Sequence, residues 1–125
     1  TYLGGHPRIH LIAPLDVVEM HNLMARCCFV MTDSGGLQEE APALGKPVLV
    51  LRRETERPEA VSAGTARLAG TEEEAVYRMA AQLLQDEGAY ADMAHAVNPY
   101  GDGRACARIA DAIAWQETAP EEFMA

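Results

Sequence analysis

The residues best suited to chemistry lie in one short stretch, residues 32–40, which follows an apolar run and leads into a helical pattern. Ser34, Gly35 and Gly36, here called the glycine turn, stand where a buried strand would turn into a helix. Such a turn exposes backbone N–H groups at a helix N-terminus, where the helix dipole favours an anion. Glu40 follows Gly36 by one helical turn, so its carboxylate lies on the same side of the helix. A phosphate at the turn and a hydroxylated sugar at the carboxylate would together make a nucleotide.

A second cluster of polar residues, the arginine loop of residues 52–57, follows the next apolar run. It contains Arg52, Arg53 and Arg57, which are three of the 10 basic residues in the chain. In open α/β sheets ligands bind outside the carboxyl ends of the strands, where the glycine turn and the arginine loop would both lie. Because a guanidinium binds phosphate in a bidentate manner, we predict a diphosphate site between them.

Each of these features also has a simpler interpretation. Strand-to-helix turns often contain glycine, Asp33 could be a helix N-cap, and Arg52 and Arg53 could be solvated loop charges. Glu40 could belong to a solvated helix face. The histidines have no Glu, Cys or Ser partner at catalytic spacing, so we assign structural or surface roles to His6, His10, His21 and His95.

The composition bounds what kind of protein this is. With 125 residues, 49% of them hydrophobic, the chain is long enough for one domain with a core. Its formal net charge of −9 argues against nucleic acid and against anionic membrane surfaces as partners. The cysteines, which include the adjacent pair Cys27 and Cys28, show neither disulfide nor metal-ligand spacing, so we predict a reducing cytoplasm and no bound metal. No apolar run is long enough to cross a bilayer.

Apolar patterning and turn residues predict an alternation of strands and helices. The expected strands are residues 9–13, 28–31, 47–51 and 65–69. The expected helices are residues 15–26, 35–44, 58–63, 75–84, 89–96 and 105–114, with Thr71 and Glu74 as a capping box and a turn at 98–103. Apolar strands without alternation are typical of a parallel sheet covered on both faces. We therefore expect one doubly wound α/β domain over residues 1–125, with 117–125 as a frayed tail.

Four motifs occur in order along the chain: TDSGGLQEEAP at 32–42, GKPVLV at 45–50, TERPEA at 55–60 and NPYGDG at 98–103. Together they closely resemble the C-terminal domain of the non-hydrolysing UDP-N-acetylglucosamine 2-epimerases of bacteria, from about residue 9 to about residue 113. The resemblance implies a Rossmann-like three-layer sandwich with a parallel sheet, which is the C-terminal half of a two-domain GT-B architecture. It also implies that the N-terminal half is absent from this chain.

The same resemblance implies a reaction and a set of binding residues. Members of the family interconvert UDP-N-acetylglucosamine and UDP-N-acetylmannosamine by elimination and re-addition of UDP, through a 2-acetamidoglucal intermediate, with no cofactor or metal. Ser34, Gly35 and Gly36 match the diphosphate-binding turn of the family. Glu40 matches the carboxylate that binds the ribose, and Arg57 matches the arginine that helps to hold the nucleotide.

Met20 stands where many members of the family place a phenylalanine against the uracil. A thioether can still pack on a ring, so we keep Met20 as a binding residue. The acid–base groups of the family belong to the other half and to the segment between the domains. We therefore expect no catalytic residue in this chain, and no activity from the chain alone.

The resemblance further implies a cytoplasmic homodimer that binds UDP-N-acetylglucosamine or UDP and serves cell-surface polysaccharide biosynthesis. Two other functions stay open. A glycosyltransferase of the same architecture would also bind a UDP-sugar in its C-terminal half, but it would release free UDP. A stand-alone nucleotide-sugar sensor is the third alternative, and the start at Thr1 rather than at Met speaks against it.

Overall fold

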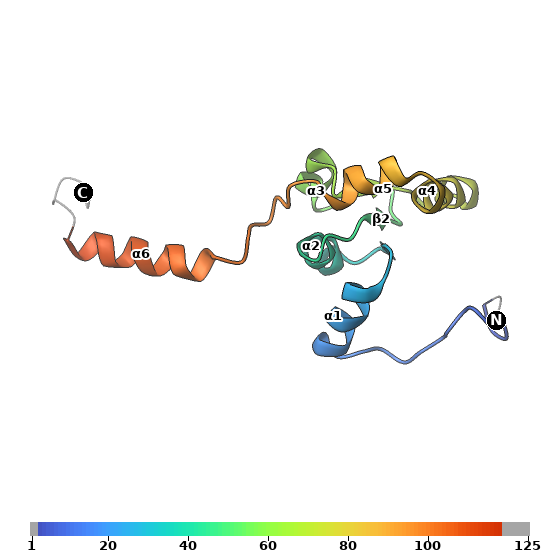
Figure 1. Ribbon diagram of the computed structural model, residues 1–125, viewed down its shortest axis with the longest axis horizontal. Helices are drawn as coiled ribbons and strands as arrows, with labels where there is room; N and C mark the ends of the chain where they lie inside the picture. The colour runs from blue at the N-terminus through green and yellow to red at the C-terminus, as the bar shows by residue number, and fades with distance from the viewer. Residues whose placement is uncertain (1–2, 119–125) are drawn as a thin grey trace.

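The structure, a computed structural model, describes residues 3–118 and is built around a small parallel sheet (Figure 1). Its strands are β1 (Val30–Thr32), β2 (Val48–Val50) and β3 (Ala66–Leu68), in the order β1-β2-β3. β2 pairs in parallel with both neighbours, so that Val48 lies opposite Val30 on one side and Ala66 on the other. Three of the predicted strands are thereby confirmed. Because parallel strands end at a common edge, the segments that follow β1 and β2 meet there.

Helices cover both faces of the sheet. In the described part of the chain they are α1 (Val17–Arg26), α2 (Gly35–Ala43), α3 (Pro58–Ala63), α4 (Glu73–Gln85), α5 (Glu87–Ala94) and α6 (Ala105–Thr118). Val48 and Val50 belong to a buried cluster with residues of α1, α2 and α3, whereas Leu49 between them belongs to a second cluster with α4 and α5. The result is the three-layer parallel α/β sandwich that the sequence predicted. Figure 1 shows α4 and α5 above β2 and α2 below it.

Capping side chains fix where the two helices nearest the glycine turn begin. α1 starts at a capping box, in which the Asp16 carboxylate accepts from the Glu19 N–H at 2.7 Å and the Glu19 carboxylate accepts from the Asp16 N–H at 3.3 Å. α2 starts with Ser34 as its N-cap, so the simpler interpretation of Asp33 as the cap is wrong. Polar side chains of the first turn therefore fix both helix starts.

The boundaries of α4 and α5 differ from the prediction. Glu72 is the N-cap of α4 and no side chain caps it, so the predicted capping box of Thr71 and Glu74 is wrong. α5 begins two residues earlier than expected because the Asp86 carboxylate accepts from the Ala89 N–H at 3.0 Å and caps the helix there. The remaining predicted helices all form, and the bounds of α3 agree with the prediction.

The first predicted strand, residues 9–13, is absent from the structure. The Ile9 N–H donates to the His6 carbonyl oxygen in a local turn, and residues 9–16 have no regular secondary structure. A strand forms only where its backbone groups pair with a neighbour, and in the described sheet nothing pairs with the outer edge of β1. The apolar side chains of Leu11 and Ile12 are consequently exposed. Apolar patterning alone was not enough to establish pairing.

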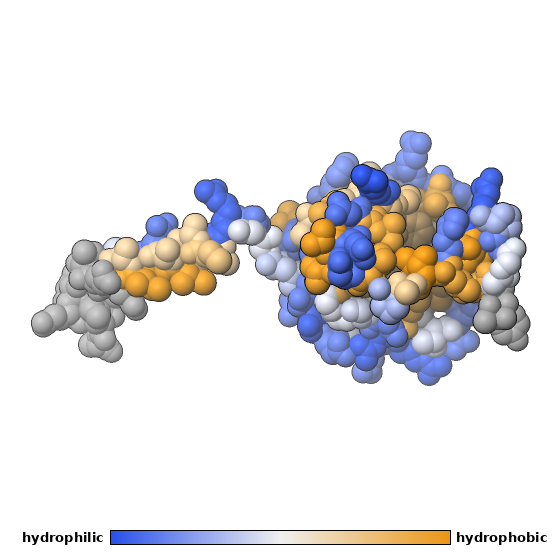
Figure 2. Space-filling model, turned by 90° about the horizontal axis from the view of Figure 1, so that it is seen from below, coloured by the Kyte–Doolittle hydropathy of each residue, from blue (hydrophilic) through white to orange (hydrophobic). Residues whose placement is uncertain are grey.

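Helix α6 extends away from the layered body after the predicted turn at 98–103 (Figure 1). Ile109 and Ile113 lie one helical turn apart on α6 and are 59% and 55% exposed. Figure 2 shows the apolar strip along this helix. α6 also includes residues 117 and 118 of the predicted tail, and residues 119–125 lie outside the described residues.

We expect Leu49→Ala to lower the free energy of unfolding by about 2–5 kcal/mol, because Leu49 is fully buried at the centre of the sheet and its loss leaves a cavity. Leu84→Ala is the matched control, since Leu84 on α4 is 67% exposed, and we expect a change within about 0.5 kcal/mol. Urea denaturation followed by circular dichroism measures both. Equal effects of the two substitutions would contradict the layered core.

Candidate functional site

The glycine turn connects β1 to α2 at the carboxyl edge of the sheet. The Ser34 hydroxyl accepts from the Leu37 N–H at 3.4 Å, and the Ser34 N–H donates to the Thr32 hydroxyl at 2.9 Å. Gly35 and Gly36 then form the first positions of α2, where backbone N–H groups have no acceptor within the helix. This part of the molecule therefore presents free N–H donors and the positive end of a helix dipole.

The side chains of the arginine loop closely approach Gly35. A Cβ atom there would lie 3.3 Å from Glu56 Oε2 and 3.5 Å from Arg57 Nη2. Neither Gly35 nor Gly36 has a positive φ, so the turn does not need glycine for its backbone conformation. A Cβ at Gly36 would meet only Ser34 Oγ, at 3.8 Å. The sequence pattern located the turn correctly, and a side chain at position 35 would require the Glu56 carboxylate to move by a few tenths of an ångström.

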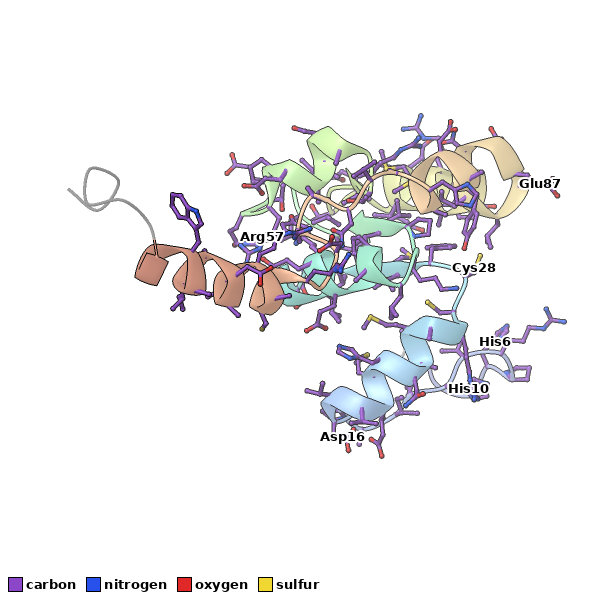
Figure 3. All side chains as sticks on the ribbon, turned by 60° about the vertical axis from the view of Figure 1, so that its left-hand side comes forward. His6, His10, Asp16, Cys28, Arg57 and Glu87 are labelled. Atoms are coloured by element: carbon purple, nitrogen blue, oxygen red, sulfur yellow. The ribbon has the colours of Figure 1, made fainter. Side chains whose placement is uncertain are left out.

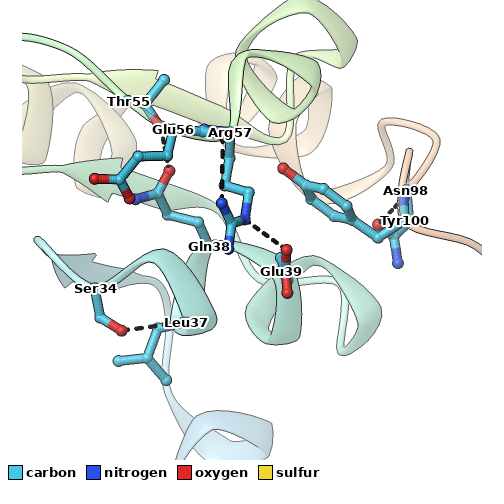
Figure 4. A network of polar contacts seen from close by, with 9 residues as sticks. All are labelled: Ser34, Leu37, Gln38, Glu39, Thr55, Glu56, Arg57, Asn98 and Tyr100. Carbon is cyan, nitrogen blue, oxygen red and sulfur yellow. Dashed lines mark hydrogen bonds and ion pairs between the residues drawn. The ribbon is translucent and has the colours of Figure 1, made fainter.

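Arg57 lies beside the glycine turn with its guanidinium fixed from two directions (Figures 3 and 4). Its Nε donates to Glu39 Oε1 at 2.5 Å, and its Nη1 donates to the Glu56 carbonyl oxygen at 3.3 Å. Nη2 is the nitrogen that faces Gly35. The Arg57 side chain is 32% exposed, so the guanidinium can still receive a ligand. The structure thus brings Arg57 together with the glycine turn, as the sequence predicted.

A buried amide and a hydroxyl hold the arginine loop against α2. The Thr55 hydroxyl donates to Gln38 Oε1 at 2.6 Å and accepts from the Arg57 N–H at 2.9 Å. Gln38 is fully buried, and its Nε2 has no hydrogen-bond partner. Figure 4 shows this chain of contacts from α2 through Thr55 to Arg57. Sequence reasoning missed the roles of Gln38 and Glu39, because their partners are close only after folding.

The other two arginines of the loop are engaged elsewhere. Arg52 forms an ion pair with Glu56 at 2.6 Å, and Arg53 forms one with Glu72 at 3.3 Å. The Arg53 side chain is 78% exposed. These contacts favour the simpler interpretation of Arg52 and Arg53 as surface charges, and they leave Arg57 as the loop arginine that faces the glycine turn.

Glu40 lies on the side of α2 that faces α1. Its Oε2 is 3.3 Å from His21 Nε2, and the two side chains are 46% and 45% exposed. Met20, His21 and Glu40 together line a cavity of about 140 Å³ between the two helices. Met20 also packs against the first buried cluster. The structure thus brings together two of the predicted binding residues and gives His21 a carboxylate partner that sequence spacing did not show.

Figure 3 shows His6 and His10 on the N-terminal segment, well away from Arg57. His95 caps the end of α5, where its backbone N–H donates to carbonyl oxygens of the last turn. For these three histidines the structure gives no reason to change the structural or surface assignment.

The turn at 98–103 places Tyr100 near the Glu39–Arg57 pair (Figure 4). The Asn98 side chain shapes this turn by accepting from the Tyr100 N–H at 3.1 Å and donating to the Gly101 carbonyl oxygen at 3.2 Å. The Tyr100 hydroxyl oxygen is buried, and burial, followed by the nearby Glu59 carboxylate, raises the pKa of Tyr100. Tyr100 is therefore a neutral side chain beside the Glu39–Arg57 pair.

Within residues 3–118, no helix has the length and apolar character that crossing a membrane requires. Nor do these residues contain a group of three or more His, Cys, Asp or Glu side chains placed to hold a metal ion.

Residues 1–114 match a protein family model described as UDP-N-acetylglucosamine 2-epimerase. Among curated proteins, the chain is 52% identical to the UDP-N-acetylglucosamine 2-epimerase of Bacillus subtilis (strain 168) and 51% identical to that of Escherichia coli (strain K12). The alignments cover 98% and 89% of this chain but 33% and 30% of those proteins. The chain thus spans about a third of the length of the curated relatives it matches.

Solved structures agree with the sequence relatives. The S. aureus MnaA–UDP co-structure superposes with a TM-score of 0.84 at 53% identity, covering 93% of this chain and 32% of that one. The UDP-GlcNAc 2-epimerase of Neisseria meningitidis bound to UDP-GlcNAc superposes with a TM-score of 0.81 at 47% identity, covering 83% of this chain and 28% of that one.

We expect Thr55→Val to lower the free energy of unfolding by about 1–3 kcal/mol. The substitution removes the hydroxyl that donates to the buried Gln38 Oε1 and accepts from the Arg57 N–H, so both groups lose this hydrogen bond. Thr71→Val is the control, since Thr71 is exposed. Its effect should stay within about 0.5 kcal/mol. Urea denaturation measures the free energy of unfolding of both variants. If Thr55→Val lowers it no more than Thr71→Val does, the hydrogen bonds of Thr55 do not hold the arginine loop against α2.

Proposed function

Because this chain belongs to the UDP-N-acetylglucosamine 2-epimerase family, we propose that it is the UDP-binding part of an enzyme that interconverts UDP-N-acetylglucosamine and UDP-N-acetylmannosamine. The observation that carries the proposal is the Arg57 guanidinium, held by Glu39 and turned toward Gly35 at the N-terminus of α2. Similar chains of known structure that carry UDP or UDP-GlcNAc in their names support the choice of ligand.

The glycine turn and Arg57 form the proposed diphosphate site. The Ser34 hydroxyl and the N–H groups of Gly35 and Gly36 supply neutral donors, and Arg57 supplies a positive charge beside them. Glu39 leaves Nη2 of Arg57 directed at the turn while it occupies Nε. A diphosphate would therefore be bound through oriented donors and one guanidinium rather than through a cluster of free cations.

The nucleoside would lie toward the hollow between α1 and α2. Glu40 offers carboxylate oxygens, which are acceptors for the two hydroxyls of a ribose. Met20 offers a polarizable thioether at the wall of the 140 Å³ cavity, where the uracil ring would pack. This assignment uses every binding residue that the sequence predicted.

The proposed reaction gives this part of the enzyme a specific task. Elimination removes the C2 proton of the sugar and breaks the bond from C1 to the UDP oxygen, so negative charge develops on the diphosphate. Arg57 and the N–H groups of the glycine turn would stabilise that charge and keep UDP in place. UDP then adds back to C1 after a proton has been delivered to the opposite face of C2. Because only the configuration at C2 changes, the overall reaction needs no external oxidant or reductant.

The proton transfers are assigned to the part of the protein that this chain lacks. The chain spans about a third of the curated relatives it matches, so we propose an N-terminal half that completes a GT-B architecture and carries the acid–base groups. The exposed apolar strip with Ile109 and Ile113 on α6 supports a further domain, because an isolated body would leave this surface in water. Homodimerisation, a cytoplasmic location and a role in cell-surface polysaccharide biosynthesis belong to the same proposal.

We expect this chain to bind UDP, and Arg57→Ala to weaken binding about tenfold to a hundredfold, since a hydrogen bond to a charged group contributes about 1.5–3 kcal/mol. Isothermal titration calorimetry with UDP measures both. Arg53→Ala is the control because Arg53 pairs with Glu72 on the surface, and it should change the affinity by less than about twofold. Absence of UDP binding at millimolar concentration, or equal effects of the two substitutions, would refute the site.

The protein that contains this chain and the N-terminal half should convert UDP-N-acetylglucosamine to its C2 epimer without releasing UDP as a product. Chromatography of the nucleotide sugars, with proton exchange from D₂O followed at C2, measures this. Glu40→Ala should reduce kcat/KM about tenfold or more, because the ribose loses its acceptor.

Free UDP together with a transferred sugar would instead indicate a glycosyltransferase of the same architecture. Binding without any turnover by the complete protein would indicate a nucleotide-sugar sensor. Either result would overturn the epimerase proposal while leaving the UDP site in place.

A further inference from the structure

We propose that His21 is a positioning residue, which holds the Glu40 carboxylate in the orientation that receives the ribose hydroxyls. This inference rests on the proposed function, because it concerns how strongly the same site holds the nucleoside. It assigns a task to a residue that the sequence placed among structural or surface histidines.

The two side chains reach each other from different helices. His21 projects from α1 and Glu40 from α2, and their Nε2 and Oε2 atoms are 3.3 Å apart. Both residues line the cavity of about 140 Å³ between the helices, and both line a second hollow of about 240 Å³ beside Ala43 and Leu44. The pair therefore stands at the point where the nucleoside would enter.

His21 is the sole side-chain N–H donor among the residues that line the 140 Å³ cavity. The others are Leu15, Asp16, Val17, Met20 and Glu40. Asp16 is a carboxylate that already accepts from the Glu19 N–H in the capping box of α1. Among the residues that line this cavity, His21 is therefore the one whose side chain can orient the Glu40 carboxylate.

The contact leaves room for a ligand. A carboxylate has two oxygens and about four lone-pair positions, and the His21 Nε2 lies against one of these oxygens, Oε2. Oε1 and the remaining positions stay available for two hydroxyl donors. An imidazole presents an N–H at Nε2 in its protonated form and in its neutral Nε2–H tautomer, so the contact that orients Glu40 needs no change of charge.

Partial exposure gives the pair its importance for binding. A glutamate side chain that is 46% exposed and lacks a partner samples several rotamers, and a ligand must then immobilise it. A partner that already holds the carboxylate removes this cost from the binding step. For the same reason the pair adds little to folding stability, so its removal should leave the fold unchanged.

The test compares UDP with 2′,3′-dideoxy-UDP, using calorimetry on the protein that includes the N-terminal half. We expect His21→Ala to weaken UDP binding about threefold to tenfold and to leave binding of the dideoxy ligand unchanged, because that ligand has no hydroxyl for Glu40. His21→Gln, whose amide N–H can replace Nε2, should restore UDP affinity to within about twofold of the original. In a Glu40→Ala background, His21→Ala should have no further effect on UDP binding.

Asn22→Ala is the matched control on α1, because the Asn22 side chain bonds to the Val18 carbonyl oxygen within the helix and is exposed. It should leave the affinity for both ligands unchanged. Circular dichroism should show the same helix content and thermal midpoint for all variants.

Equal weakening of both ligands by His21→Ala would show that the histidine only braces α1 against α2, and it would overturn the inference. The inference would also be overturned if His21→Ala lowered the affinity for UDP and His21→Gln lowered it equally. If Glu40→Ala weakens UDP binding and His21→Ala does not, the inference fails while the proposed function stands. If UDP does not bind at all, or if Glu40→Ala has no effect, the proposed function fails instead.

Discussion

Three consecutive side chains of α2 contact the segments that surround the candidate site, which are the arginine loop and α1. Gln38 is buried and accepts from Thr55 in the arginine loop, Glu39 accepts from Arg57, and Glu40 pairs with His21 on α1. Successive helical residues project about 100° apart, so one turn of helix can contact three different neighbours. α2 in turn is fixed by the strand before it and by its Ser34 cap. The site therefore depends on how closely α2 packs against the arginine loop.

That packing also brings the arginine loop close to the glycine turn. Gly35 lies where a Cβ would come within 3.3 Å of Glu56, and this closeness is produced by the same contacts that hold Arg57. Gly35 thus lies where two segments approach each other closely, and its backbone φ is not positive. The donors of the turn and the guanidinium converge because α2 and the loop are in direct contact.

Local patterns in the sequence predicted the elements that depend on local chemistry. The fully apolar strand β2, the proline at the start of α3 and the strand-to-helix turn at Ser34 all carry their structural reason within a few residues. The contacts of Gln38, Glu39 and His21 were missed because each partner lies on another element, and nothing in the spacing shows which residues meet. The predicted strand at 9–13 failed for a related reason, since pairing depends on a neighbour and not on the apolar pattern itself. Packing between elements therefore limits what local sequence can show.

The electrostatics of the site reconcile an acidic chain with an anionic ligand. The formal net charge of −9 describes the whole surface, but charges further away than about one Debye length, about 8 Å at physiological ionic strength, contribute little. Near the glycine turn, Arg52 is neutralised by Glu56, and Arg57 is partly neutralised by Glu39. The attraction for the proposed diphosphate would then come mainly from oriented N–H groups and from the part of the Arg57 guanidinium that faces the turn. Because such donors act over short distances and in fixed directions, they favour a compact phosphate group and offer little to an extended polyanion. The same residues thus support both the sequence-based prediction that nucleic acid is not a partner and the proposed selection of a nucleotide.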